Sequence, residues 1–329
     1  MIENSLEKYS VGALLYTPAL NEGIAKAVAT ERFGKQYSLA LCLEDTIAPD
    51  QVKDAELKVL DTLRVITVSF QQANSNFYLP KIFIRVRSTD QALQLYERLG
   101  PSAEILTGFI FPKYDTVNAD SCNRCMEQLN AHSDRTVYMM PILESEDLVP
   151  FHTRSRVLRE IKEKIDSVAR YVLNIRVGGN DFSNVFSVRR HIDETIYDIG
   201  PIAQLFGDIV STFSSDYVLS GPVWEYFNGE DGAWENGLRR EIRCDKLNGF
   251  IGKTVIHPKQ IPVVNSMLRV TKRDYEDARA IASWDPHGLQ VGKSYNGERM
   301  NEVRTNINWA LKTLALAEIY GIETAHNEV

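Results

Sequence analysis

Ionisable side chains follow most of the short apolar segments of this chain. A single charged residue after a strand is most often part of a solvated loop. Here six of eight such segments end in charged or titratable residues, which would bring several carboxylates and cations around one opening. These end groups are Glu44-Asp45, Arg85 with Arg87, Lys113, Glu144 with Glu146, Asp181 and His257.

Glu144 and Asp181 are the best candidates for metal ligands among these residues. They end consecutive apolar segments, and Gly178 and Gly179 before Asp181 allow the backbone to approach a ligand closely. Mg²⁺ is usually held by one or two carboxylates, while water and substrate complete its octahedron. We therefore predict a Mg²⁺ site here, with the planar guanidinium of Arg85 as a clamp for a substrate carboxylate.

Two other groups offer weaker signals. His257, before Pro258, suits an acid, a base or a ligand, but a structural hydrogen-bonding role is favoured. Cys122 and Cys125 form a CxxC spacing, yet no second pair and no nearby His completes a four-ligand site. We interpret both cysteines as ordinary residues of a helix.

The elements that must position these groups alternate between β-rich runs and amphipathic segments, which is typical of parallel βα units. Eight strands are predicted, and several are apolar throughout, as expected when helices cover both faces. This pattern favours an α/β fold, a (β/α)8 TIM barrel, although an open doubly wound sheet gives the same local pattern. The predicted strands are residues 13–18, 39–45, 81–87, 106–113, 136–144, 171–177, 217–223 and 253–257.

After Pro258 the β pattern stops, and residues 260–270, 272–283 and 298–320 are predicted to be helical. We expect residues 1–270 to form the barrel with the metal site, and residues 271–329 a C-terminal helical extension that acts as a lid or a subunit contact. Residues 284–298 form a polar, Gly-rich loop, and loops of that length are usually functional or disordered. This loop and the aromatic residues Trp224, Tyr226 and Phe227 are candidate specificity elements.

Composition narrows the class of protein. The 329 residues are 44% hydrophobic and 25% charged, with a formal net charge of −7, which is an ordinary globular composition. The negative charge and the absence of long basic runs argue against a nucleic-acid partner. No segment has the pattern of a signal peptide or a membrane span, so we expect no membrane partner and a cytoplasmic protein.

The ordered motifs of the chain resemble those of the citrate lyase beta-subunit and malyl-CoA lyase group of the HpcH/HpaI aldolase superfamily. The most specific match is Gly249-Phe-Ile-Gly-Lys-Thr-Val-Ile-His257-Pro258-Lys-Gln260, similar to that family's GFxGKxxIHPxQ signature. The other matches, in the same order as in the family, are Tyr16-Thr17-Pro18, Leu43-Glu44-Asp45, Arg85-Val86, Pro112-Lys113, Glu144 and Gly178-Gly179-Asn180-Asp181.

The resemblance implies a Mg²⁺-dependent carbon–carbon lyase or aldolase that cleaves or forms a β-hydroxy acid or its thioester, CoA included. It implies a homo-oligomer, usually a trimer or hexamer. Glu144 and Asp181 match the metal ligands, and Arg85 matches the residue that holds the carboxylate of the keto acid. Glu44 and Asp45 match the acidic pair around the metal's waters, and they complete the catalytic set with Arg85. Lys113, Gly179 and Asn180 lie in matching motifs and are expected to bind substrate.

Departures from the family pattern bear on the substrate. Arg87 replaces an asparagine and adds a cation beside the clamp, and Asn301 stands where an aspartate would reach into a neighbouring subunit's site. A carboxamide cannot act as a base, so Glu302 takes that role or the mechanism differs. Two alternatives stay open: a non-catalytic ligand-binding or complex-assembly homologue, and an enzyme of the same barrel type that uses enolpyruvate chemistry.

Overall fold

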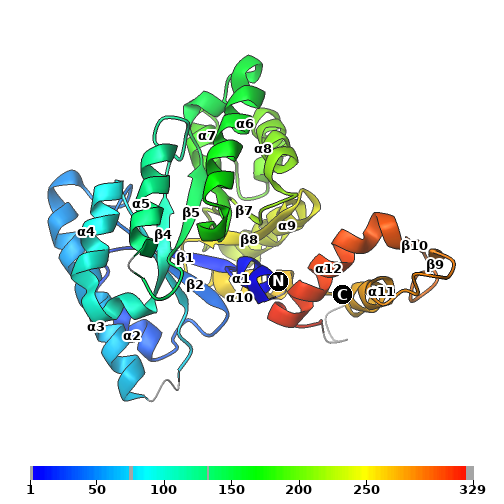
Figure 1. Cartoon of the computed structure of the whole chain (residues 1–329), viewed down its shortest axis with the longest axis horizontal. Coiled ribbons are helices and arrows are strands. Elements are labelled where there is room, and N and C mark those ends of the chain that lie inside the picture. Colours follow the sequence, from blue (N-terminus) through cyan, green and yellow to red (C-terminus); the bar gives the residue numbers. More distant parts are fainter. Residues whose placement is uncertain (1–2, 74–76, 132, 324–329) are drawn as a thin grey trace. The chain divides into compact units, whose positions relative to one another are not determined.

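The computed structural model describes residues 3–73, 77–131 and 133–323. Its eight main strands form a closed, all-parallel barrel in which β1 pairs with both β2 and β8 (Figure 1). The predicted (β/α)8 barrel is therefore confirmed, and closure excludes the open doubly wound sheet. The strands are β1 (Ala13–Pro18), β2 (Tyr37–Cys42), β3 (Lys81–Arg85), β4 (Leu106–Phe111), β5 (Tyr138–Leu143), β6 (Ile175–Val177), β7 (Leu219–Gly221) and β8 (Phe250–Val255).

Helices follow the strands around the barrel (Figure 1). The long α3 turns buried residues such as Val59 and Leu63 inward, and the hydroxyl of Ser88 caps α4 by accepting a hydrogen bond from the Gln91 amide at 3.2 Å. The helices of this part are α2 (Ile24–Ala29), α3 (Val52–Gln72), α4 (Thr89–Leu99), α5 (Ala119–Ala131), α6 (Phe151–Ser167), α7 (Gly179–Val185), α8 (Gly200–Phe213), α9 (Ala233–Leu247) and α10 (Gln260–Leu268).

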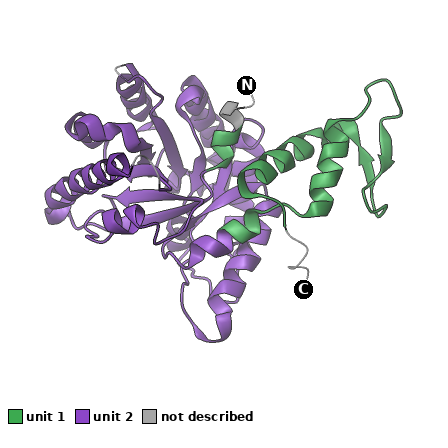
Figure 2. Cartoon of the chain, turned by 90° about the horizontal axis from the view of Figure 1, so that it is seen from below, with its two compact units in different colours: residues 1–10, 265–329 green, residues 11–264 purple. Residues whose placement is uncertain are grey.

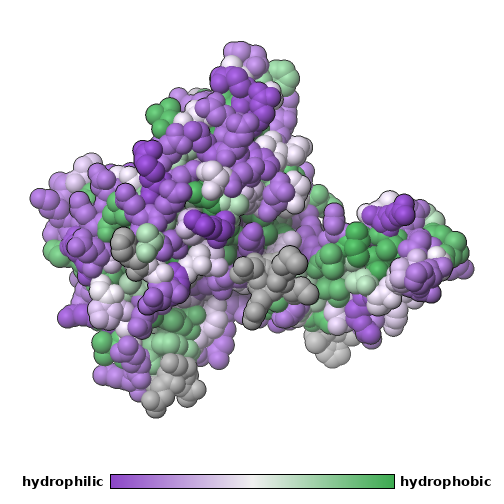
Figure 3. All heavy atoms as spheres, viewed as in Figure 1, coloured by the Kyte–Doolittle hydropathy of each residue, from purple (hydrophilic) through white to green (hydrophobic). Residues whose placement is uncertain are grey.

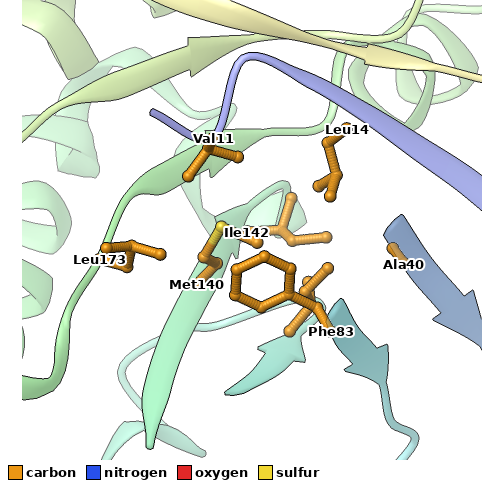
Figure 4. Close-up of a cluster of buried hydrophobic side chains, with 8 residues drawn as sticks. Val11, Leu14, Ala40, Phe83, Met140, Ile142 and Leu173 are labelled. Carbon is orange, nitrogen blue, oxygen red and sulfur yellow. The ribbon is translucent and has the colours of Figure 1, made fainter. Parts of the chain in front are cut away.

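An apolar cluster of side chains fills the barrel interior (Figure 4). Side chains on a strand alternate between the two faces, so residues two positions further along point into the barrel above this cluster. Met140 and Ile142 belong to the cluster, and Glu144 follows them at the same spacing. The cluster consists of Val11, Leu14, Ala40, Phe83, Ile110, Met140, Ile142 and Leu173.

The chain divides into two compact units, residues 11–264 and residues 1–10 with 265–329 (Figure 2). In the second unit, α1 (Glu3–Tyr9), α11 (Lys272–Ala282) and α12 (Val303–Tyr320) pack together, and the Tyr320 hydroxyl donates a hydrogen bond to the Tyr9 carbonyl at 2.7 Å. Residues 324–329 of the predicted extension lie outside the described residues.

The expectation that no strand follows Pro258 is wrong. β9 (Val291–Lys293) and β10 (Met300–Glu302) form an antiparallel pair within the predicted loop and helix, so α12 begins only at Val303. The pair is held by contacts distant in sequence: the Arg299 guanidinium reaches Asp277 at 2.8 Å, and the Trp284 ring leaves no room for a side chain at Gly292.

On the face shown in Figure 3 the barrel unit is mostly hydrophilic, whereas hydrophobic side chains gather over α12. Leu311 of this helix is exposed. No helix among the described residues is both long and apolar enough to cross a membrane.

Candidate active site at the carboxyl ends of the strands

A cavity of about 220 Å³ opens within the barrel unit at the carboxyl ends of the strands, where TIM-barrel enzymes place their active sites. Six of the predicted site residues line it, namely Asp45, Arg85, Glu144, Gly179, Asn180 and Asp181. Glu44 and Lys113 do not line the cavity but contact residues that do. The other lining residues are Tyr16, Cys42, Thr46, Ile142, Arg176, Val177, Gly178, Val223, Thr254 and Ile256.

The carboxylates of Glu144 and Asp181 meet beside Gly178. A Cβ atom at Gly178 would lie 2.2 Å from Glu144 Oε2 and 3.0 Å from Asp181 Oδ2, so the two carboxylates occupy the space that a side chain would fill. These distances put the two oxygens at most 5.2 Å apart, and the Glu144 carboxyl is also hydrogen-bonded to the Asp181 side chain, so the two groups are in direct contact. The structure thus brings together the two residues predicted as metal ligands.

Glu144 is only 5% exposed, and its Oε1 accepts a hydrogen bond from the Lys113 backbone amide at 3.0 Å. Burial, followed by the nearby charge of Asp181, raises the pKa of Glu144 to about 8, against an ordinary value of 4.5. The positive charge of Arg85 acts in the opposite direction but does not cancel these effects. The site therefore holds acidic groups that repel each other and favour a cation.

Arg85 ends β3 and faces three carboxylates. Its Nη2 lies 2.7 Å from Glu44 Oε2, 2.9 Å from Asp45 Oδ2 and 3.6 Å from Glu144 Oε1. Its Nε is buried and has no hydrogen-bond partner among the described residues. The guanidinium is therefore oriented by Glu44 and Asp45 while one donor stays available to a ligand.

Lys113 and Glu44 link the strand ends of β4 and β2. The Lys113 Nζ lies 3.2 Å from Glu44 Oε1, and its side chain is 52% exposed. Lys113 also adopts a left-handed backbone conformation with φ of 51°, which is costly for a residue with a side chain and is found at functional sites. This conformation belongs to the turn that presents its amide to Glu144.

Arg87 does not add a cation beside the clamp, contrary to the expectation from sequence. Its guanidinium donates to the backbone carbonyls of Leu43 at 2.6 Å, Glu44 at 2.8 Å and Ile47. Arg87 therefore fixes the loop after β2, which carries Glu44 and Asp45, and it does not line the cavity.

Sequence reasoning missed Arg176, and it noted Thr254 and Tyr16 only as parts of motifs. Arg176 lies on β6 and is 1% exposed, and its Nη2 donates to Thr254 Oγ1 on β8 at 2.6 Å. The signal was present in the sequence, since Arg176 is a cation inside a run that is otherwise suited to a buried strand.

The residues with weaker sequence signals make contacts typical of structural residues. The imidazole of His257 stacks on Phe227 with centroids 4.8 Å apart, and its Nδ1 accepts from the Lys259 amide at 3.2 Å. Cys122 and Cys125 are buried in α5, where burial raises the pKa of each thiol to about 12, so neither is a thiolate at neutral pH. Asn301 is buried in β10 of the other unit.

A family model described as a C–C bond lyase of the TIM-barrel fold matches residues 5–322. No curated protein matches the chain. Among solved structures, CitE of Mycobacterium tuberculosis with magnesium, acetoacetate and coenzyme A is 19% identical, with a TM-score of 0.59 over 94% of this chain and 99% of that chain.

Two further structures are similar. RipC of Yersinia pestis is 16% identical, with a TM-score of 0.52 over 79% of this chain and 95% of that chain. The citrate lyase beta subunit of M. tuberculosis with oxaloacetate and magnesium is 18% identical, with a TM-score of 0.50 over 79% of this chain and 98% of that chain. At these identities the likenesses show a shared fold.

Proposed function

Because the chain belongs to the family of C–C bond lyases of the TIM-barrel fold, we propose that it is a Mg²⁺-dependent lyase that cleaves or forms a β-hydroxy acid or its thioester. The observation that carries this proposal is the convergence of Glu144 and Asp181 beside Arg85 at the cavity. That arrangement would let one small acid contact both a divalent cation held by the two carboxylates and the guanidinium of Arg85.

The residues fit Mg²⁺. Glu144 and Asp181 supply hard carboxylate oxygens, and a divalent cation between them would relieve the repulsion that helps to raise the pKa of Glu144. Within the described residues no group of three or more His, Cys, Asp or Glu is arranged to hold a metal. Two protein ligands with water and substrate in the other positions are what Mg²⁺ usually takes.

When bound, Mg²⁺ would act as a Lewis acid on the keto oxygen of the substrate. Arg85 would donate to the substrate carboxylate, while Glu44 and Asp45 hold that guanidinium in place and accept hydrogen bonds from water. Lys113 would hold Glu144 through its amide and add positive charge at the rim. Gly179 and Asn180 would line the substrate's path into the cavity.

In the cleavage direction the β-hydroxyl gives its proton to a water molecule and becomes the carbonyl of the keto acid. The carbon–carbon bond breaks, its electron pair passes to the acyl fragment as an enolate, and the enolate carbon then takes a proton from water. Fixed positive charge at the strand ends would stabilise the negative charge that develops. Magnesium with acetoacetate and coenzyme A in one solved relative, and with oxaloacetate in another, supports a keto acid and an acyl fragment as reactants.

The experiment is to incubate the full chain with Mg²⁺ and a panel of β-hydroxy acids and their CoA thioesters, and to detect keto acid by mass spectrometry. We expect product with the unmodified chain and none with Asp181→Asn, whereas Glu146→Gln, which neutralises an exposed carboxylate outside the cavity, keeps the activity. Near-normal turnover by Asp181→Asn would refute the assignment.

A second candidate is a non-catalytic ligand-binding or complex-assembly homologue, which Asn301 favours because a carboxamide cannot serve as a base. It predicts Mg²⁺-dependent keto-acid binding by calorimetry without product from any member of the panel. The homo-oligomer implied by the family resemblance is part of the proposal and is measured by light scattering.

A further inference from the structure

Arg176 is a buried cation that lacks an anion. It is 1% exposed, and its Nε and Nη1 have no hydrogen-bond partner among the described residues. Its Nη2 donates a 2.6 Å hydrogen bond to the hydroxyl of Thr254, and the hydroxyl of Tyr16 is its other hydrogen-bonding neighbour, so both partners are uncharged. Guanidinium stays protonated in proteins, so this charge is held inside the barrel without compensation.

The other buried cations of the described chain are compensated. Lys253 contacts Glu241 at 2.6 Å and Asp245 at 2.8 Å, and Arg190 lies 3.1 Å from Glu241. Arg154 reaches Asp208 at 2.8 Å, and Arg85 contacts its three carboxylates. Burying an ion is costly unless it is paired, so the exception at Arg176 points to a partner that the chain itself does not supply.

The position of Arg176 identifies where that partner lies. Arg176, Thr254 and Tyr16 line the same cavity as Glu144 and Asp181. Arg176 precedes Gly178 by two residues on its strand, which places its backbone about 7 Å deeper in the barrel than the point where the two carboxylates meet. The Tyr16 hydroxyl is buried beside Arg176, and an oxygen that accepts from the guanidinium keeps its own proton to donate, so it adds a second donor at this depth.

We propose that Arg176, Thr254 and Tyr16 form an anion subsite at the floor of the cavity, which binds a second compact anionic group of the substrate, a carboxylate or a phosphate. The inference rests on the proposed function, in which Mg²⁺ and Arg85 hold the first carboxylate. It makes the substrate a short keto or hydroxy acid with two anionic groups. Guanidinium is the side chain best suited to a buried carboxylate or phosphate, because its planar donors match either group.

The test measures binding to the full chain in Mg²⁺ by calorimetry, with three probes that share an α-keto acid head. Oxaloacetate carries a second carboxylate, 3-phosphonopyruvate carries a phosphonate, and 2-oxobutyrate carries neither. We expect at least tenfold tighter binding of one dianionic probe than of 2-oxobutyrate, and the tighter of the two identifies the group. Arg176→Met should remove this difference while changing 2-oxobutyrate affinity less than about threefold, and Arg176→Lys should restore part of it.

Arg98→Met is the matched control, because it removes the same charge at the surface of the barrel unit, where Arg98 pairs with Glu56. It should keep the full preference. A preference that survives in Arg176→Met, or equal affinity of the unmodified chain for all three probes, would overturn the subsite while leaving the lyase proposal intact. Failure of every keto acid to bind in Mg²⁺ would instead overturn the proposed function, and the subsite with it.

Discussion

The carboxylate oxygens Glu144 Oε2 and Asp181 Oδ2 lie on one side of the Gly178 α-carbon, 2.2 Å and 3.0 Å from the position of an absent Cβ. Any residue other than glycine at position 178 would have to displace the Glu144 side chain. The closeness of these two groups depends on a strand end with no side chain, and it determines what the site can bind.

Replacing Gly178 by alanine should therefore abolish Mg²⁺ binding. The new methyl group would push the Glu144 carboxylate away from Asp181 and separate the two ligands. Isothermal titration calorimetry with Mg²⁺ measures the loss, and we expect no detectable heat.

Gly207→Ala is the control for that substitution. Gly207 lies in the interior of α8, and nothing lies within 4 Å of the position its Cβ would take. Alanine should stabilise the helix there by about 1 kcal/mol and leave Mg²⁺ affinity unchanged. If Gly178→Ala bound Mg²⁺ as tightly as Gly207→Ala does, the two carboxylates would not be the ligands.

Glu144→Gln should lose Mg²⁺ binding and turnover, yet raise the thermal stability of the metal-free protein at pH 8 and above. Glutamine keeps the size of the side chain and removes the buried charge that Asp181 opposes. Thermal unfolding by circular dichroism tests this: a lower melting temperature than that of the unmodified chain would mean that Glu144 is ionised and stabilised by Arg85.

Mg²⁺ affinity should increase with pH. With a pKa of about 8, Glu144 carries a proton at pH 7 that must leave before the metal binds. The apparent Kd for Mg²⁺ should fall about tenfold per pH unit between pH 6 and pH 8 and level off above pH 8. Calorimetry in two buffers of different ionisation enthalpy should detect about one released proton at pH 7, and a Kd that does not change with pH would contradict the shift.

The raised pKa of Glu144 also determines how the stability of the folded protein changes with pH. Between pH 4.5 and 8 the folded, metal-free chain keeps a proton that the unfolded chain releases, so its stability should fall as pH rises through that window. Urea unfolding measures this slope, and Glu144→Gln provides the comparison, because it should remove the contribution of this group.

The sequence predicted most of the barrel because local chemistry and periodicity agree there. β1 has the predicted bounds, and Ser88, a residue type that often caps helices, caps α4. The β9–β10 pair was missed because Val291–Lys293 has no apolar alternation, and contacts of Trp284 and Asp277 hold it instead. Tertiary contacts of this kind leave no local pattern.

Some residues of the candidate site could be predicted from the sequence, and others could not. Residues at strand ends, such as Glu144 and Asp181, were predictable because parallel strands end at one edge of a barrel. Arg176 lies inside β6, where the strand-end pattern gives no reason to expect a functional residue. The structure shows that it lines the cavity. The role of Arg87 depends on three loop carbonyls, which no spacing in the sequence reveals.

The missing anion at Arg176 also predicts an unusual pattern of stability. Arg176→Met removes an unpaired buried charge and keeps a side chain of similar length, so the metal-free and ligand-free protein should be as stable as the unmodified chain, or more stable by about 1 kcal/mol. Lys253→Met is the matched substitution on β8, and it leaves Glu241 and Asp245 buried without their cation, at a cost of about 3 to 5 kcal/mol. Urea unfolding of both variants at pH 7 measures the contrast. A loss at Arg176 as large as the loss at Lys253 would mean that Arg176 is compensated within the chain, and its charge would then need no ligand.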